Sequence, residues 1–323
     1  MSDIPRFVEI HEEGPREGFQ IEKGPISTER KIELIDELSQ TGLREIQVVS
    51  FVNPKRVPGW ADAEQVVAGF TRRSGVRYTA LWLNGKGLER AIATGRLDVM
   101  GGIALCPTEK FLKLNQNRTL AENIDAQLDR IQVFKRHGIA IERAGITAAF
   151  GCNYEGDMPN QAVVDLIDKL LQLAGENGST IKTLRLSDTM AWANPLSIKR
   201  LVGAVREQYP SLRVALHLHD TRGMAIANAF AGLEMGVDLF DAAVGGLGGC
   251  PFANHKGAAG NVCTEDLVFM CQEMGIETGV DLERLIEVGQ LAEVIVGHPL
   301  PGSVKVGGSL QTLREKIAAA QAA

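Results

Sequence analysis

Residues 214–223, VALHLHDTRG, join a short apolar run to a group of polar and ionisable side chains. The run has the length and composition of a buried β-strand. Two histidines, His217 and His219, lie at its end, and because side chains alternate along a strand, both imidazoles project from the same face. In a barrel of parallel strands, reactive groups collect at the carboxyl ends of the strands. This stretch therefore predicts both a strand and a functional edge.

Short β-branched runs of the same kind alternate along the chain with longer stretches whose apolar residues recur every three or four positions. Eight strands are predicted, at about 7–10, 45–51, 77–83, 99–105, 139–149, 184–188, 214–219 and 239–244. Helices are predicted between them, for example at 28–39, 120–136 and 197–207. Eight such units in about 250 residues favour a closed barrel over an open doubly wound sheet, which usually has fewer strands and a glycine-rich dinucleotide loop.

The predicted fold class is therefore α/β, a (β/α)8 TIM barrel with a short C-terminal helical extension. We expect the barrel to occupy residues 1–280 and the extension, at 281–323, to pack on it as a helical appendage, because no linker composition separates the two.

The composition excludes several classes of partner. The 323 residues are 45% hydrophobic and carry a formal net charge of −6, which gives no global attraction to nucleic acid or to anionic lipid. No run of about 18 apolar residues could span a membrane, and the N-terminus lacks the features of a signal peptide, so a cytoplasmic protein is expected. Five cysteines without a CxxC pair argue against a disulfide framework and against a structural zinc site.

Polar residues gather where the strands are predicted to end. They occupy EEGPREGFQ at 12–20 after the first strand, SDT at 187–189 after the sixth, and a glycine-rich loop at 245–261 after the eighth. His217 and His219 are close enough to bind one ion, although a packed, hydrogen-bonded pair is the alternative. Imidazole nitrogens together with carboxylate and amide oxygens suit Mg or Mn, with Zn as a third candidate.

Two further side chains, Arg16 and Cys250, are candidate catalytic residues. Arg16, at the end of the first strand, is a fixed cation that could stabilise a developing enolate oxygen, and a surface salt bridge is its alternative role. Cys250 is the reactive side chain of the glycine-rich loop, which has the composition of a mobile lid. An inert buried thiol is the alternative for Cys250.

These segments, taken in order, resemble the 3-hydroxy-3-methylglutaryl-CoA lyase family within the metal-dependent DRE-TIM metallolyase superfamily. The resemblance runs from Val8 to about Leu285. Its motifs are SFVNPK at 50–55, GCNYEG at 151–156, SDT at 187–189, HLHDT at 217–221, GGCP at 248–251, and GN at 260–261 followed by TEDLV at 264–268. HxH alone would be a weak signal, whereas the ordered set is specific.

The resemblance implies a carbon–carbon lyase that cleaves a 3-hydroxy-3-methylglutaryl-CoA-like thioester to acetyl-CoA and a keto acid, which is acetoacetate for the parent substrate. It implies metal ligation by Glu17, His217, His219 and Asn261. It implies catalytic roles for Arg16, Asp188, His217 and Cys250, with Arg16 polarising the thioester carbonyl and Cys250 protonating the departing enolate. It implies substrate contacts from Gln20, Lys23, Gln47 and Ser50. A homodimer is implied as well.

Three departures from the family pattern bear on the substrate. The family has Asp where this chain has Glu17, and Glu where it has Gln47, which cannot accept a proton as a carboxylate does. Residues 254–256 resemble a short insertion in the loop. These changes suggest a related thioester such as citramalyl-CoA or a longer branched 3-hydroxyglutaryl-CoA. A condensing acyltransferase of the isopropylmalate or homocitrate synthase type and a non-catalytic metal-binding barrel stay as alternatives.

Overall fold

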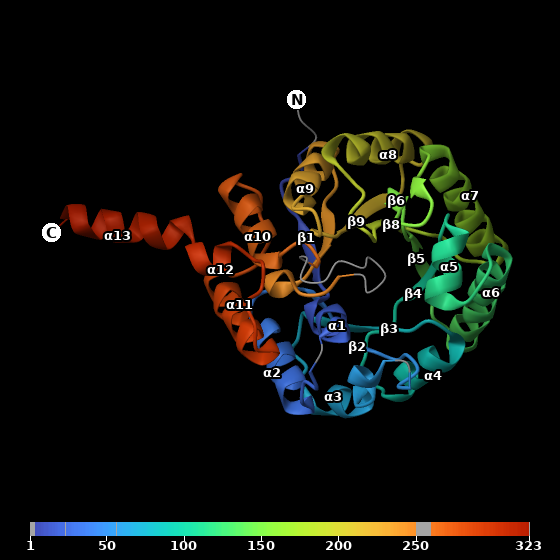
Figure 1. Cartoon of the computed structure of the whole chain (residues 1–323), viewed down its shortest axis with the longest axis horizontal. Coiled ribbons are helices and arrows are strands. Elements are labelled where there is room, and N and C mark those ends of the chain that lie inside the picture. The colour runs from blue at the N-terminus through green and yellow to red at the C-terminus, as the bar shows by residue number, and fades with distance from the viewer. Residues whose placement is uncertain (1–3, 23, 56, 250–259, 323) are drawn as a thin grey trace.

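The computed structural model describes residues 4–22, 24–55, 57–249 and 260–322. Eight parallel strands form one sheet in the order β3-β2-β1-β10-β9-β8-β5-β4. Their bounds are Glu9–Glu12 (β1), Glu45–Ser50 (β2), Arg77–Leu81 (β3), Gly101–Leu105 (β4), Ile141–Ile146 (β5), Thr183–Asp188 (β8), Arg213–Leu218 (β9) and Leu239–Ala242 (β10). The sheet curls round so that β1 pairs with β10, and the helices form the outer ring of a (β/α)8 barrel (Figure 1).

The barrel helices lie between consecutive strands or, for the last helix, after the final strand. They are Thr28–Leu38 (α2), Ala63–Gly69 (α3), Gly85–Ala93 (α4), Glu109–Gln116 (α5), Leu120–Arg136 (α6), Asn160–Glu176 (α7), Pro195–Gln208 (α8), Ala225–Glu234 (α9) and Thr264–Glu273 (α10). Their apolar faces and the outward side chains of the strands make a large core, with side chains such as Leu34, Ile46 and Leu216 fully buried. The buried residues of α5, Phe111 and Leu112, belong to a second, smaller cluster. The α/β fold class predicted from periodicity is confirmed.

Most predicted boundaries lie within a few residues of the observed ones. The fifth strand is an exception: the prediction ran to 149, whereas β5 ends at Ile146, because the chain turns at Ala148, whose φ is +52°, into the short hairpin Gly151–Cys152 (β6) and Gly156–Asp157 (β7). The first strand begins later than predicted. Val8 donates its backbone N–H to Glu277 O at 2.9 Å, outside the barrel sheet.

The sheet has two ends, β3 and β4, which are consecutive in the chain and neighbours in the ring (Figure 1). No ladder joins them in the described part of the chain. On this edge the backbone N–H of Ala104 donates to Gln127 Oε1 of α6 at 3.1 Å. A helix side chain thus satisfies a donor that a strand neighbour would otherwise pair.

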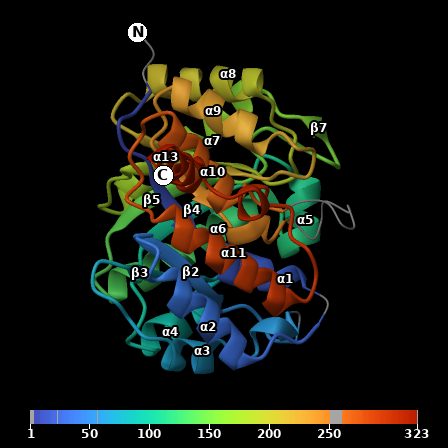
Figure 2. The same ribbon diagram turned by 90° about the vertical axis from the view of Figure 1, so that its left-hand side faces the viewer.

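The C-terminal extension has two parts. Leu282–Val296 (α11) buries Leu285, Ile286 and Val288, and the short helix Val304–Gly307 (α12) is tied to it by an ion pair between Lys305 and Glu293 at 2.7 Å. Leu310–Ala322 (α13) differs from the expected packing: it has no buried residue and projects away from the barrel (Figures 1 and 2). Its large apolar side chains Leu310, Leu313 and Ile317 are exposed. None of the helices among the described residues is long and apolar enough to cross a membrane.

Candidate active site

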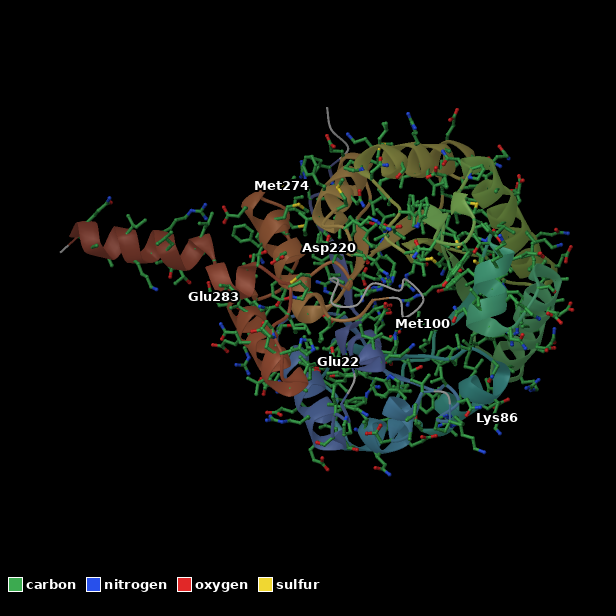
Figure 3. The ribbon with its side chains drawn as sticks, viewed as in Figure 1. Glu22, Lys86, Met100, Asp220, Met274 and Glu283 are labelled. Carbon is green, nitrogen blue, oxygen red and sulfur yellow. The ribbon has the colours of Figure 1, made fainter. Side chains whose placement is uncertain are left out.

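One large cavity, of about 1330 Å³, runs from the loops that follow the first strands into the barrel interior. Its lining combines His217 and His219 with Arg16, Glu17 and other residues of the segment after β1. In Figure 3, Glu22 and Met100, which also line it, lie near the middle of the ring, whereas Lys86 lies on the rim. The cavity therefore occupies the carboxyl edge where the sequence predicted a site.

Two imidazoles converge at the inner wall of this cavity. His217 Nε2 and His219 Nε2 lie 3.0 Å apart, and the rings are buried. His219 Nδ1 donates to the backbone oxygen of Thr189 at 2.8 Å, and His217 Nδ1 donates to Asp241 Oδ2 at 3.2 Å. With both Nδ1 atoms used as donors, the two Nε2 lone pairs face one another, an arrangement that a shared cation would stabilise.

Two side chains with oxygen atoms, Glu17 and Asn261, lie next to the imidazoles. Glu17 Oε1 lies 3.1 Å from His219 Nε2 and 4.0 Å from His217 Nε2. Asn261 forms an isolated bridge with His219, and its Nδ2 donates to Leu247 O at 3.0 Å. Its Oδ1 is buried and has no hydrogen-bond partner among the described residues. An orphaned amide oxygen beside two imidazoles and a carboxylate fits a divalent metal, and Glu17 reaches the histidines despite its extra methylene.

Gly248 makes room for this cluster. A Cβ at this position would lie 2.5 Å from Asn261 Nδ2 and 3.0 Å from Glu17 Cγ. The backbone φ of Gly248 is +92°, a value that residues other than glycine rarely adopt. Glycine at position 248 therefore has a local structural reason. It lets the backbone lie close to two of the candidate ligands, Asn261 and Glu17.

Arg16 is held from three sides. The segment Gly14–Gly18 (η1) is a π-helical turn, and it places the Arg16 guanidinium against Glu13 Oε2 at 2.6 Å and Glu17 Oε2 at 2.9 Å. Arg16 Nε donates to Gln47 Oε1 on β2. Burial and the charge of Asp241 raise the pKa of Glu13. Burial also opposes the ionised form of Glu17, but the Arg16 charge and the interactions with His219 and His217 together hold its pKa well below its ordinary range. Arg16 is thus a fixed cation with two carboxylate partners.

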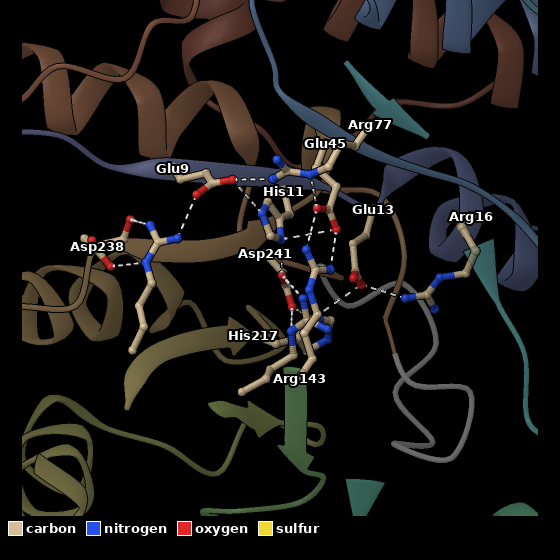
Figure 4. A network of polar contacts seen from close by, with 12 residues as sticks. Glu9, His11, Glu13, Arg16, Glu45, Arg77, Arg143, His217, Asp238 and Asp241 are labelled. Carbon is tan, nitrogen blue, oxygen red and sulfur yellow. Dashed lines mark hydrogen bonds and ion pairs between the residues drawn. The ribbon is translucent and has the colours of Figure 1, made fainter. Parts of the chain in front are cut away.

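A network of ion pairs occupies the barrel interior next to His217 (Figure 4). Asp241 accepts from Arg185 Nη2 at 2.8 Å, and Glu45 accepts from both terminal nitrogens of Arg143 at 2.7 Å. Burial opposes the ionised form of Asp241, but Arg185 and His217 hold its pKa down at about 2. Asp241 is therefore ionised at neutral pH and fixes the tautomer of His217.

Glu13 and Asp241 were not predicted from the sequence as site residues. Asp241 was detectable as a lone carboxylate within the apolar strand 239–244. Glu13 gave no comparable signal, because its contacts with Arg16 and His217 arise only from the η1 turn.

Only some of the other predicted site residues line the cavity. Gln20 and Gln47 line the cavity, and Gln20 Oε1 is buried without a partner among the described residues. Ser50 is fully buried on β2 and is not among the lining residues. Asp188 Oδ1 accepts from the backbone of Trp192 and Ala193, and burial raises the pKa of this carboxyl to about 6. Lys23 and Cys250 lie outside the described residues.

Comparison with known proteins finds relatives along most of the chain. The model of the HMGL-like family matches residues 7–292. Hydroxymethylglutaryl-CoA lyase YngG of Bacillus subtilis is 39% identical over 297 residues, which cover 92% of this chain and 96% of that protein. The human cytoplasmic 3-hydroxy-3-methylglutaryl-CoA lyase is also 39% identical, over 90% of this chain and 75% of that protein.

Solved structures give the same result. The HMG-CoA lyase of Bacillus subtilis superposes with a TM-score of 0.85 at 38% identity, covering 94% of this chain and 98% of that one. An HMG-CoA lyase from Acinetobacter baumannii, in complex with coenzyme A and 3-methylmalate, superposes with a TM-score of 0.84 at 35% identity, covering 94% and 96%.

Proposed function

The chain belongs to the HMGL-like family, and on this premise we propose that it cleaves a carbon–carbon bond in a 3-hydroxy-3-methylglutaryl-CoA-like thioester, releasing acetyl-CoA and a keto acid. The observation that carries the proposal is the convergence of His217, His219, Glu17 and the free oxygen of Asn261 beside the fixed guanidinium of Arg16. Relatives over most of the chain are named as lyases of this reaction.

A divalent metal, held by Glu17, His217, His219 and Asn261, would supply a Lewis acid that polarises substrate oxygens. We take Mg or Mn as the ion, because the set includes two oxygen ligands of the hard type. Asp241 and the Thr189 carbonyl orient the two imidazoles through their Nδ1 atoms.

Arg16 provides the charge that the reaction needs when the bond breaks. Cleavage moves an electron pair onto the acyl α-carbon, and the thioester oxygen takes up negative charge as the enolate forms. A guanidinium already clamped by Glu13 and Glu17 needs little reorganisation to stabilise that charge. The neutral Gln47 keeps a hydrogen bond to Arg16 Nε, and the two carboxylates balance the cation from its other side.

Proton transfers are assigned to two other residues. Asp188 Oδ2 is buried without a partner among the described residues, and a pKa of about 6 suits a group that exchanges a proton near neutral pH. Cys250, from the family's lid motif, is proposed to protonate the departing enolate. Gln20 and Gln47, which line the cavity, are proposed substrate contacts, together with Lys23 and Ser50. A homodimer and a cytoplasmic location stay predictions of the sequence.

The test is an acetyl-CoA release assay across a panel of 3-hydroxy acyl-CoA thioesters, with Mg, with Mn and with chelator. The panel includes citramalyl-CoA and thioesters of other branched hydroxy dicarboxylic acids, because one solved relative is in complex with coenzyme A and 3-methylmalate. Metal-dependent release from at least one thioester is expected. Condensation of acetyl-CoA with 2-keto acids and no cleavage of any thioester would instead identify a synthase.

A further inference from the structure

Two of the arginines that line the cavity form no ion pair with any carboxylate among the described residues. The cavity lining includes six arginine and lysine side chains among the described residues: Arg16, Lys31, Arg118, Arg130, Arg143 and Arg185. Four of them form ion pairs: Arg16 with Glu13, Lys31 with Asp62, Arg143 with Glu45 and Arg185 with Asp241. Arg118 and Arg130 form none with the described residues, and the acidic lining residues Glu13, Glu17, Glu22, Asp62 and Asp241 already contact other cationic side chains.

Arg130 is the more enclosed of the two. Its Nε atom is buried and lacks a hydrogen-bond partner among the described residues. It lies three residues after Gln127, whose side chain reaches the backbone of β4, so both face the barrel at the edge where β3 and β4 do not pair. The β4 residues that line the cavity here, Gly102 and Ala104, are small, which leaves space in front of the guanidinium.

Arg118 is positioned by rigid local structure. It lies between Asn117, the left-handed C-cap of α5, and Thr119, the N-cap of α6, which forms a capping box with Glu122. Among the described residues, its side chain donates one hydrogen bond, from Nη1 to the neutral amide oxygen of Gln116 at 3.1 Å. Burial, and to a smaller extent repulsion from the Arg118 guanidinium, lower the pKa of Arg130 to about 10, so Arg130 stays a cation at neutral pH.

An enclosed cation without a counter-ion costs free energy, and a second cation beside it adds to that cost. Such a pair is tolerated where an anion completes it, and guanidinium groups match carboxylate and phosphate oxygens in a bidentate manner. We propose that Arg118 and Arg130 form a subsite for an anionic group of the acyl-CoA ligand, a carboxylate of the acyl moiety or a phosphate of coenzyme A. This inference rests on the proposed function of the cavity, because both arginines share it with Arg16, His217 and His219.

Calorimetric titration of the metal-loaded protein with three probes tests the subsite without catalysis: coenzyme A, 3′-dephospho-coenzyme A and glutarate. Arg130→Gln and Arg118→Gln should each weaken at least one probe by about tenfold or more, which corresponds to about 1.4 kcal/mol. Arg314→Gln, which removes an exposed arginine paired with Glu273 outside the cavity, should leave all three affinities unchanged.

The pattern of losses identifies the anion. A loss confined to coenzyme A assigns the 3′-phosphate, an equal loss for both coenzymes assigns the diphosphate, and a loss for glutarate assigns an acyl carboxylate. Unchanged affinities for all three probes in both variants would overturn the subsite. Should Arg130→Gln fail to fold, Arg118→Gln decides with the same probes.

Thermal unfolding separates binding from a structural role. Without probe, Arg130→Gln should melt at or above the wild-type temperature, because an uncompensated buried charge is removed. A lower melting temperature together with unchanged affinities would make Arg130 structural and would end the proposal. Calorimetry and thermal unfolding need no turnover. If the variants bind the probes more weakly but the protein cleaves no thioester, the lyase proposal is disproved and the subsite proposal is retained.

Discussion

Asp241 Oδ2 lies 3.2 Å from His217 Nδ1, so a carboxylate buried within β10 orients an imidazole on the neighbouring strand β9. The same carboxylate is paired with Arg185, which keeps it ionised. This contact fixes which nitrogen of His217 faces His219 and Glu17. It connects the polar barrel interior to the candidate metal ligands.

We therefore expect Asp241→Asn to lower metal affinity by about 10-fold to 100-fold. The amide of Asn can turn its NH2 group, instead of an oxygen, toward His217 Nδ1, and the substitution leaves Arg185 without its carboxylate partner. Manganese binding followed by titration calorimetry would measure this. Asp238→Asn is the matched control, because Asp238 pairs with Arg213 away from the histidines. Equal affinities in both variants would contradict an orienting role for Asp241.

Metal binding should depend on pH. Burial disfavours the charged imidazole of His217, but Asp241, Glu17 and Glu13 outweigh it and raise the pKa of His217 to about 9. Because only neutral imidazole is a ligand, a metal must displace this proton at lower pH. Apparent Mn affinity should fall by about tenfold for each pH unit below about 9. Titrations from about pH 6 to 9 would check this, and a flat profile would count against ligation by His217.

Arg16→Gln should lower turnover by about 100-fold or more, the size expected for losing a preorganised charge. Metal content should stay unchanged, because Arg16 is not among the candidate ligands. Steady-state kinetics and metal analysis on the same preparation test both statements. Arg72→Gln, which removes an arginine paired with Asp98 at the surface, is the control and should keep wild-type rates. Near-normal turnover of Arg16→Gln would remove Arg16 from the mechanism.

Gly248→Ala should weaken metal binding by about tenfold, because the new methyl group would displace Asn261 or Glu17. Gly223→Ala is a matched control: Gly223 has a similar φ of +70°, but a Cβ there meets no atom within 4 Å. Both variants carry the backbone strain of a positive φ, about 1–3 kcal/mol. Only Gly248→Ala should change metal affinity. An equal loss of metal affinity in both variants would mean that backbone strain causes the effect.

Glu45 should contribute stability that acid removes. Burial alone would raise its pKa, but hydrogen bonds and charge from Arg143 and Arg77 lower it to about 2. A folded pKa below the unfolded value of about 4.5 means that this stability is complete above about pH 5 and is lost as the pH falls toward 2.

In urea unfolding near neutral pH, Glu45→Gln should therefore be less stable than wild type by about 3–5 kcal/mol, the effect of breaking a buried pair. The difference should shrink as the pH falls toward about 3. Glu64→Gln, at a surface pair with Arg90, should change little. A pH-independent difference would mean that Glu45 acts through packing.

The amino-acid sequence by itself determined the barrel and much of the ligand cluster. Strand and helix periodicity is a local property, and it located β2 and α6 within a residue of their observed bounds. The two-residue spacing of His217 and His219 was enough to put both rings on one face, since that follows from the pleat of any strand.

Only the tertiary structure decided which distant groups meet. The Arg16 contacts with Glu13, the orientation of His217 by Asp241, and the isolation of Arg118 and Arg130 from every described carboxylate all depend on barrel curvature and on the η1 turn. Periodicity contains no information about such contacts, because they join residues that are far apart in the chain or that only a tight turn brings together. Charge pairing is a property of three-dimensional neighbours, and the sequence shows only the charges.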